Sequence, residues 1–485
     1  MQQLSGLDTV FLNIETNACP MHVGGLVILE QPKVAEDDGG FGRILRHIES
    51  RLDAIPPLRR RLLTTPLGLD HPYWIEDPDF DVEHHVRHRA LPSPGDDAKL
   101  VELVCELAST RLDRNLPLWE IHFVEGLKDG RLATITKMHH AAIDGVSGAE
   151  ILGNFLDVTP KPRQLPAPLV PWKPDDLPSM MDLMKRTARS WAGRPSLALR
   201  AVRDTLPLLL STARDVLERR KLRTGDQTTP TTAGLAPRTR FNRHITARRS
   251  FAFGSLPLDQ LKAVKQAFGT TLNDVILGVC AEALCRYLKK WDDLPAAPLV
   301  AGVPMSTRSE AQKGQGGNAV VFLRASLHTD EPDLVERLRK ISREMSGVKE
   351  RQRALPASLM GDWAQLPAPA LMARAARLYE NFGIQDYHTP AFNLVISNVP
   401  GPPVPLYFAG LKVLANHPIS IPFHGAAFNI TLMSYCGKLD FGLIADRDTM
   451  PDISLFADYM HEALATLLAR AKAAVAPAQH GAVEA

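Results

Sequence analysis

A mixed α/β fold in two consecutive domains is the architecture that this sequence predicts, and three observations support it. The chain has 485 residues, which is too many for one ordinary hydrophobic core. Short apolar strands alternate with amphipathic helices over residues 1–165 and again over residues 241–475. A segment of different composition, 166–240, separates these halves, and a polar tail follows at 476–485. The alternation lacks a regular strand–helix–strand rhythm, so mixed sheets are expected rather than a doubly wound parallel sheet.

The first half contains the clearest strand and helix patterns. Its expected strands are 22–30 and 132–139, and its expected helices are 41–52, 98–112 and 147–158. The strands are apolar and β-branched, whereas the helices have apolar residues at helical spacing. The last helix has Ser147 as its N-cap, with Glu150 three residues later. Residues between this helix and the strand before it are therefore expected to form a turn.

The second half repeats the same kinds of pattern. Its expected strands are 297–306, 319–327, 392–399, 427–435 and 439–446, and its expected helices are 272–291 and 332–351. The last two strands flank Cys436, Gly437 and Lys438 and form a pair. No short-period repeat relates the two halves.

The composition excludes several classes of function. A formal net charge of +2 gives no general attraction to nucleic acid, and 45% hydrophobic with 23% charged residues is typical of globular proteins. Five scattered cysteines, an odd number, argue against a disulfide framework and fit a reducing compartment. The N-terminus lacks the basic and apolar regions of a signal peptide, and no apolar run reaches the roughly 18 residues of a spanning helix. We therefore expect a cytoplasmic protein that contacts the inner membrane or lipid inclusions at most peripherally.

Residues 137–148, KMHHAAIDGVSG, place two adjacent histidines where a predicted strand ends. One interpretation is purely structural, and residues 83–88, EHHVRH, show that a histidine pair also occurs here without the following aspartate and glycine. A metal site is disfavoured, because adjacent residues of a strand point to opposite faces and no HExxH pattern or nearby cysteine cluster is present.

A third interpretation of this stretch makes one histidine a general base. Alternation along the strand then directs one of His139 and His140 into a cleft and the other inward. Asp144 would fix the loop by pairing with a distant arginine, and Gly145 would allow the backbone to turn tightly. Loops held by rigid elements commonly present reactive groups in this way.

The whole pattern HHAAIDG, at 139–145, resembles the HHxxxDG signature of the superfamily of chloramphenicol acetyltransferase, which includes CoA-dependent acyltransferases and peptide condensation domains. Six further stretches narrow the resemblance: LSGLDTVFLNIETNACPMHVGGL at 4–26, PLWEIHFVEGL at 117–127, TLNDVILGV at 271–279, VPMSTR at 303–308, NLVISNVPGP at 393–402 and FNITLMSYCGKLDFGL at 428–443. Together they resemble the bacterial wax ester synthase/acyl-CoA:diacylglycerol acyltransferase family. Only 165–235 and the C-terminal tail lack this resemblance.

The resemblance implies a fold, an activity and roles for the site residues. It implies two chloramphenicol-acetyltransferase-like domains with an active-site tunnel at their interface, which acyl-CoA and a lipid alcohol enter from opposite sides. The activity would be transfer of a long-chain acyl group from acyl-CoA to diacylglycerol or to a long-chain fatty alcohol. His140 would be the general base, His139 a supporting residue and Asp144 a structural one. No cofactor is expected, since acyl-CoA is a substrate.

The implied reaction needs a base and oxyanion donors. A neutral His140 would take the hydroxyl proton as the oxygen attacks the thioester, and the imidazolium would then protonate the departing CoA thiolate. Candidate donors to the oxyanion are Asn273 and the Ser397–Asn398 pair. Neither a metal nor a covalent acyl-enzyme is required.

The remaining candidates for substrate contact also have structural explanations. Pro117 and Trp119 are more readily explained as core residues than as tunnel residues. Asp274, with its neighbour Asn273, suits the start of a helix as well as an active site. Arg308 is our preferred partner for the aspartate of the histidine motif, because a buried aspartate must be paired.

The segment between the halves is basic and amphipathic. Residues 185–223 contain eleven lysines and arginines against three acidic residues, and leucines are interleaved with them. Such a segment is either a packed spacer or a contact with anionic lipid over 181–223. Two other functions stay open besides lipid acylation: amide condensation on carrier-bound substrates, and a non-enzymatic lipid-binding protein with a decayed site. The intact histidine motif argues against decay, and the chain shows no neighbouring carrier domain.

Overall fold

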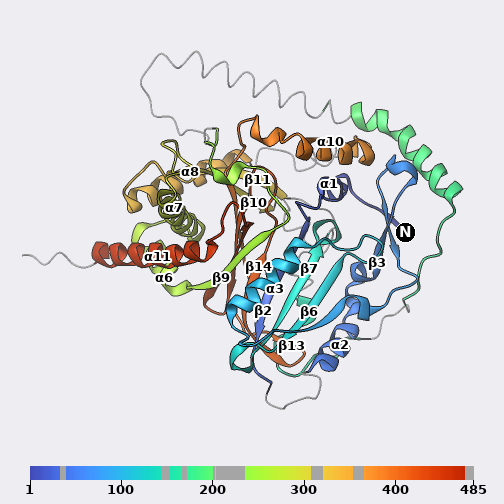
Figure 1. Cartoon of the computed structure of the whole chain (residues 1–485), viewed down its shortest axis with the longest axis horizontal. Coiled ribbons are helices and arrows are strands. Elements are labelled where there is room, and N and C mark those ends of the chain that lie inside the picture. Colours follow the sequence, from blue (N-terminus) through green and yellow to red (C-terminus); the bar gives the residue numbers. More distant parts are fainter. Residues whose placement is uncertain are drawn as a thin grey trace, which may run out of the picture.

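The computed structural model describes residues 1–32, 40–143, 153–166, 172–199, 203, 235–306, 320–352 and 365–475. Two large sheets lie side by side with helices around them (Figure 1). A small third sheet combines β1 (Gln2–Gln3), β4 (Tyr73–Glu76) and β3 (Arg60–Leu63).

The first large sheet has seven strands. In spatial order they are β5 (Val86–Ala90), β6 (Trp119–Glu125), β7 (Leu132–His139), β2 (His22–Leu29), β14 (Leu411–Ile419), β13 (Tyr407–Phe408) and β8 (Leu156–Asp157). All neighbours are antiparallel except β5 and β6. The central pair, β2 and β7, aligns His22 with His139, so the strand that leads to the histidine motif lies in the middle of the sheet.

The second large sheet has six strands and is also mixed. Its order is β11 (Val320–Ser326), β10 (Val300–Ser306), β12 (Leu394–Val399), β15 (Phe428–Tyr435), β16 (Lys438–Asp446) and β9 (Arg249–Pro257). β12 is parallel to β10 and to β15, and the other pairs are antiparallel. The two-domain α/β fold with mixed sheets is therefore confirmed.

Helices cover both sheets, and the side chains of Ser5, Asp96 and Thr271 cap three of them, α1, α3 and α7. The α-helices are α1 (Gly6–Ile14), α2 (Phe41–Glu49), α3 (Asp97–Ser109), α6 (Leu258–Phe268), α7 (Leu272–Lys290), α8 (Leu334–Gln352), α10 (Pro369–Asn381) and α11 (Ile453–Val475). A further helix over 180–199 is called the connector helix below. The short 3₁₀ turns are η1 (Leu52–Ala54), η2 (Pro56–Arg59), η3 (Pro66–Gly68), η4 (Val82–His84), η5 (Lys128–Gly130), η6 (His140–Ile143), η7 (Arg240–Asn242) and η9 (Ile384–Asp386).

The two domains share a strand. β13 and β14 come from the second half of the chain, yet β14 pairs with residues 24–29 of β2 in the first sheet. β14 also contacts the second sheet, because the Asn416 backbone N–H donates to Asp440 Oδ2 at 2.8 Å. The Pro418 carbonyl lies so close to Gly442 that a Cβ there would be 1.8 Å away, which excludes a side chain at this position. The sequence pattern missed β14, whose apolar positions are interrupted by Lys412, Asn416 and His417.

One predicted helix ends earlier than its pattern indicated. The first half of 147–158 lies outside the described residues, but Leu156 and Asp157 form β8 and pair with β13. The buried Asp157 also accepts two hydrogen bonds from Arg51, at 2.8 and 3.1 Å. Tertiary pairing thus overrides the helical spacing at this end.

The largest core cluster lies in the second domain, around α7, α11 and the inner face of the second sheet. Within the part of the chain that the structure describes, no single helix is long and apolar enough to cross a membrane. The helices α6 and α7 reach that length and apolar content only when they are taken together, and they are bent by 103° where they meet.

Candidate active site

The histidine motif begins where β7 ends. His139 is the last residue of β7, and His140 opens the turn η6, so its direction is set by that turn rather than by strand alternation. The His140 backbone N–H donates to the Met21 carbonyl at 2.8 Å, which continues the pairing of β7 with β2. The His140 ring stacks on Phe11 of α1, with ring centroids 4.0 Å apart and planes at 16°. The base candidate is thus held from the backbone and from one ring face.

His140 is uncharged at neutral pH. Its side chain is partly exposed. Burial first, and the proximity of His139 second, lower the pKa of His140 to about 4. The imidazole is therefore neutral near pH 7, which is the form that a general base requires.

His139 lies in the interior and has a defined tautomer. The Ala141 backbone N–H donates to His139 Nδ1 at 3.1 Å, so Nε2 carries the proton. That nitrogen faces Glu15 Oε1 at 3.6 Å. Burial lowers the pKa of His139 below its ordinary value, which keeps the ring neutral. These contacts describe a side chain that supports the turn.

Glu15 connects the elements on both sides of His140. Its Oε2 accepts hydrogen bonds from Arg114 Nη2 and Nε, at 2.7 and 3.1 Å, and its Oε1 accepts the Met21 N–H at 3.2 Å. Met21 in turn accepts the His140 N–H through its carbonyl. Burial alone would raise the pKa of Glu15, but His139 and Arg114 outweigh that effect and lower it to about 2. We attribute the lowering mainly to Arg114, since His139 is neutral.

The site lies against the second domain. A buried apolar cluster combines Cys19 and Met21 of the first domain with Ile245, Ile421 and Ala427 of the second, and Phe11 packs against it. Arg249 of β9 also donates to the Ala18 carbonyl at 2.5 Å. The residues that contact His140 are therefore also the residues that join the two domains.

Pro117 and Trp119 lie beside the motif and are buried. Trp119 Nε1 donates to the Leu58 carbonyl at 2.7 Å, and its ring stacks on His85 at 4.5 Å. The Leu118 carbonyl between them accepts the His139 N–H at 2.9 Å. Trp119 fills the core, and this stretch shapes the strand that ends at the motif.

Asn273 and Asp274 begin α7 in the second domain. Asp274 and Thr271 form a capping box, in which Asp274 Oδ2 accepts the Thr271 N–H at 2.9 Å and the Thr271 hydroxyl accepts the Asp274 N–H. The same carboxylate accepts the Ser342 hydroxyl at 2.8 Å. These contacts give Asp274 a structural role in its own domain, while Asn273 is partly exposed.

Ser397 and Asn398 lie on β12 and pair with Thr431 and Leu432 of β15. Both are partly exposed. The turn after β12 is tight, since a Cβ on Gly401 would lie 2.1 Å from the Ser434 carbonyl oxygen. Asp144, Gly145 and Arg308 lie outside the described residues.

Four of the described cysteines are poorly suited to nucleophilic catalysis. Burial raises the pKa of Cys19 and Cys280 to about 12 and that of Cys105 and Cys285 to about 11, so these thiols are poor nucleophiles. Among the described residues, no three His, Cys, Asp or Glu side chains are grouped as metal ligands.

The fold of two α/β domains with mixed sheets, and the histidine motif at the end of a central strand, can be compared with those of known proteins. Family models for the wax ester synthase/diacylglycerol acyltransferase catalytic domain and for the WS/DGAT C-terminal domain match residues 4–276 and 316–468. The chain belongs to the wax ester synthase/diacylglycerol acyltransferase family and is an acyltransferase.

Individual relatives match over almost the whole chain. A probable diacylglycerol O-acyltransferase of Mycobacterium tuberculosis is 37% identical over 480 residues, covering 95% of this chain and 97% of the relative. The O-acyltransferase WSD of Acinetobacter baylyi is 32% identical, with 95% and 96% covered. The solved wax ester synthase/diacylglycerol acyltransferase from Marinobacter aquaeolei VT8 superposes with a TM-score of 0.67 at 34% identity, covering 97% and 99%.

Proposed function

We propose that this protein transfers a long-chain fatty acyl group from acyl-CoA to the free hydroxyl of diacylglycerol, and that a long-chain fatty alcohol is a second acceptor. The observation that carries the proposal is the neutral His140 at the domain interface of a chain from this family. The names of its relatives support the acceptors, since they include diacylglycerol O-acyltransferase and wax ester synthase.

The proposed mechanism is direct attack without an acyl-enzyme. The imidazole of His140 takes the proton of the acceptor hydroxyl as its oxygen forms a bond to the thioester carbonyl carbon. The tetrahedral intermediate carries its negative charge on the former carbonyl oxygen, for which Asn273 and Ser397–Asn398 stay our candidate donors. Collapse of the intermediate breaks the C–S bond, and the imidazolium returns the proton to the CoA thiolate. We propose that no cofactor takes part and that both substrates meet in a tunnel between the domains.

Asp144 and Arg308 belong to the same proposal. An ion pair between them would hold the turn after His140, and Gly145 would let the backbone turn there. Contact with an anionic membrane or lipid-inclusion surface through 181–223 would bring a water-insoluble acceptor to the enzyme.

A single assay tests the reaction and the base. Purified protein is mixed with labelled palmitoyl-CoA and either diacylglycerol or hexadecanol, and the ester products are quantified. We expect His140→Ala to lower ester formation by about 10²-fold or more while the protein stays folded, since a positioned base contributes 10²–10⁴ in rate. Near-normal turnover of the His140→Ala variant would refute the general-base role, and the absence of ester from the unmodified protein would refute the proposed activity.

A further inference from the structure

The helix α10 turns an apolar stripe towards solvent. Leu371, Ala375, Leu378 and Phe382 follow one another at the spacing of a single helix face, and all four are exposed. The three large side chains are 62%, 52% and 68% exposed. The opposite side of α10 packs against α1. A helix on a globular protein normally directs such a stripe to the core, so the exposed stripe requires an explanation.

The connector helix has the same property. Leu183 and Thr187 point inward and are buried, whereas Met181, Met184 and Trp191 are 60%, 53% and 45% exposed. These three residues are again at helical spacing on one face. The sequence of this helix therefore places apolar side chains on both of its sides.

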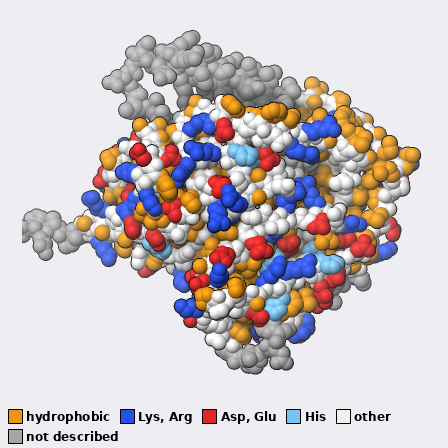
Figure 2. Space-filling view, in the orientation of Figure 1, with side chains coloured by type: hydrophobic (Ala, Val, Ile, Leu, Met, Phe, Trp, Pro, Cys, Tyr) orange, Lys and Arg blue, Asp and Glu red, His pale blue; other side chains and the backbone are white. Residues whose placement is uncertain are grey.

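The two helices form one continuous surface. Trp191 Nε1 donates to the Leu69 carbonyl at 3.0 Å, and Arg194 Nη1 donates to the Leu366 carbonyl at 3.3 Å. Leu67, at the tip of η3 between the helices, is 86% exposed. Hydrophobic side chains gather along this edge of the molecule, over the connector helix and α10 (Figures 1 and 2). We call this surface the apolar face; it consists of Leu67, Met181, Met184, Trp191, Leu371, Leu378 and Phe382.

The charges on the two helices indicate what the apolar face contacts. The exposed charged residues of the connector helix and α10 are Lys185, Arg186, Arg189, Arg374, Arg377 and Asp182. Five cations against one anion would repel a second copy of the chain, since a two-fold interface sets the same surface against itself. An anionic lipid surface matches both the apolar side chains and the basic residues. It accepts apolar side chains below its head groups, and the head groups attract basic residues. Trp191 and the nearby exposed Tyr387 are also residue types enriched at such interfaces.

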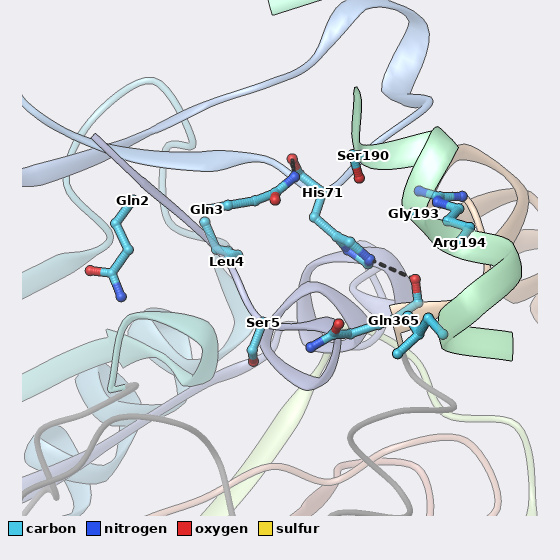
Figure 3. A pocket seen from close by; sticks show the side chains of 10 residues that line it. Gln2, Gln3, Leu4, Ser5, His71, Ser190, Gly193, Arg194 and Gln365 are labelled. Atoms are coloured by element: carbon cyan, nitrogen blue, oxygen red, sulfur yellow. Dashed lines mark hydrogen bonds between the residues drawn. The ribbon is translucent and has the colours of Figure 1, made fainter. Parts of the chain in front are cut away.

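An open, mainly polar pocket of about 620 Å³ lies between the connector helix and the N-terminal residues of the chain. Ser190, Gly193 and Arg194 of the connector helix line one side, and Leu4 and Ser5 lie across from them (Figure 3). Ser5 caps the start of α1, the helix that carries Phe11 on the His140 ring. One helix thus connects this pocket with the candidate base.

We propose that the apolar face docks on an anionic lipid surface, with the basic residues of the connector helix and α10 at its head groups. The inference rests on the proposed function, because it explains how a water-insoluble acceptor reaches the site. The inference adds α10 and η3 to the lipid-contacting surface, which the basic pattern of the sequence had placed only at 181–223.

Vesicle binding tests the proposal. The triple variant Leu371→Ser, Leu378→Ser, Phe382→Ser removes apolar side chains that are already exposed, and Val158→Ser, Val404→Ser, Val475→Ser is a matched control at exposed positions elsewhere. Each protein is sedimented with phosphatidylglycerol/phosphatidylcholine vesicles at low and high salt. Turnover is measured with octanoyl-CoA on two acceptors, vesicle-borne diacylglycerol and the soluble alcohol hexanol.

The expected result separates docking from catalysis. We expect the α10 variant to bind anionic vesicles at least tenfold more weakly and to lose a similar factor on vesicle-borne diacylglycerol, while its turnover on hexanol and the control variant stay unchanged. Arg374→Gln with Arg377→Gln should weaken binding mainly at low salt. Unchanged vesicle binding of the α10 variant overturns the proposal. The proposal is also overturned if the unmodified protein does not bind vesicles and sedimentation velocity shows that it is a dimer which the α10 substitutions convert to a monomer. Absence of turnover on both acceptors in the unmodified protein would instead count against the proposed function.

Discussion

Replacing Glu15 by Gln should weaken both the fold and the turn that presents His140. Glu15 is buried, and its pKa of about 2, against an ordinary value of 4.5, corresponds to about 3 kcal/mol of stabilisation at neutral pH. Arg114 is 41% exposed, and water screens part of its contribution. We therefore expect Glu15→Gln to lower the free energy of unfolding by about 2 kcal/mol, or Tm by about 2 °C for a cooperative unit of 485 residues.

The pH dependence of this loss has a definite sign. Because the folded-state pKa of Glu15 is lowered, its stabilisation is complete above pH 4.5 and disappears as the pH falls towards 2. Thermal unfolding followed by circular dichroism between pH 3 and pH 8 should therefore show the two proteins converging at the acid end. Glu15→Gln should also lower kcat by about tenfold, because Glu15 holds Met21, whose carbonyl receives the His140 N–H.

A matched control distinguishes positioning from stability alone. Burial would raise the pKa of Glu120, but its contacts with His122 and Lys137 lower it to about 2. Glu120 lies on β6 and pairs with Lys137 of β7, two residues before His139. Glu120→Gln should lower Tm without a selective loss of kcat. A Glu15→Gln protein with unchanged Tm and unchanged kcat, or with the same kinetic profile as Glu120→Gln, would refute the reasoning.

Two further predictions follow from the same contacts. In a plot of kcat/KM against pH, the fall on the acid side should lie near pH 4 rather than pH 6.5, because burial lowers the pKa of His140 and only its neutral form accepts a proton. A fall near pH 6.5 in a protein that stays folded would contradict this prediction. Trp119→Phe should destabilise the protein by about 1–3 kcal/mol, since it leaves the buried Leu58 carbonyl without its indole donor. A lower Tm together with an unchanged KM for acyl-CoA would support a role of Trp119 in the core.

The sequence predicted the elements whose patterns are local. Strands such as β7 and β16 and the helix α7 were visible because their apolar spacing and caps lie within each segment. β14 and β8 were missed, because each is defined by a partner strand far away in the chain and not by its own pattern. Local spacing cannot report such pairings.

The candidate site was predicted only in part, for a similar reason. The histidine motif marked the base and the end of β7, and the quoted stretch 4–26 already contained Phe11 and Glu15 without indicating what they contact. Arg114 gave no signal, since its bond to Glu15 joins segments that only the fold brings together. The roles of Asp144, Gly145 and Arg308 stay predictions.

The shared strand β14 determines when the first domain can be completed during synthesis. β2 lies at the start of the chain, whereas its neighbour β14 is Leu411–Ile419, so β2 has an unpaired edge until most of the protein has been made. Ribosomes add roughly 5–20 residues per second, and an unpaired strand edge over that interval favours association with other chains. The first domain therefore cannot finish folding ahead of the second, and expression of residues 1–165 alone should give an aggregation-prone product.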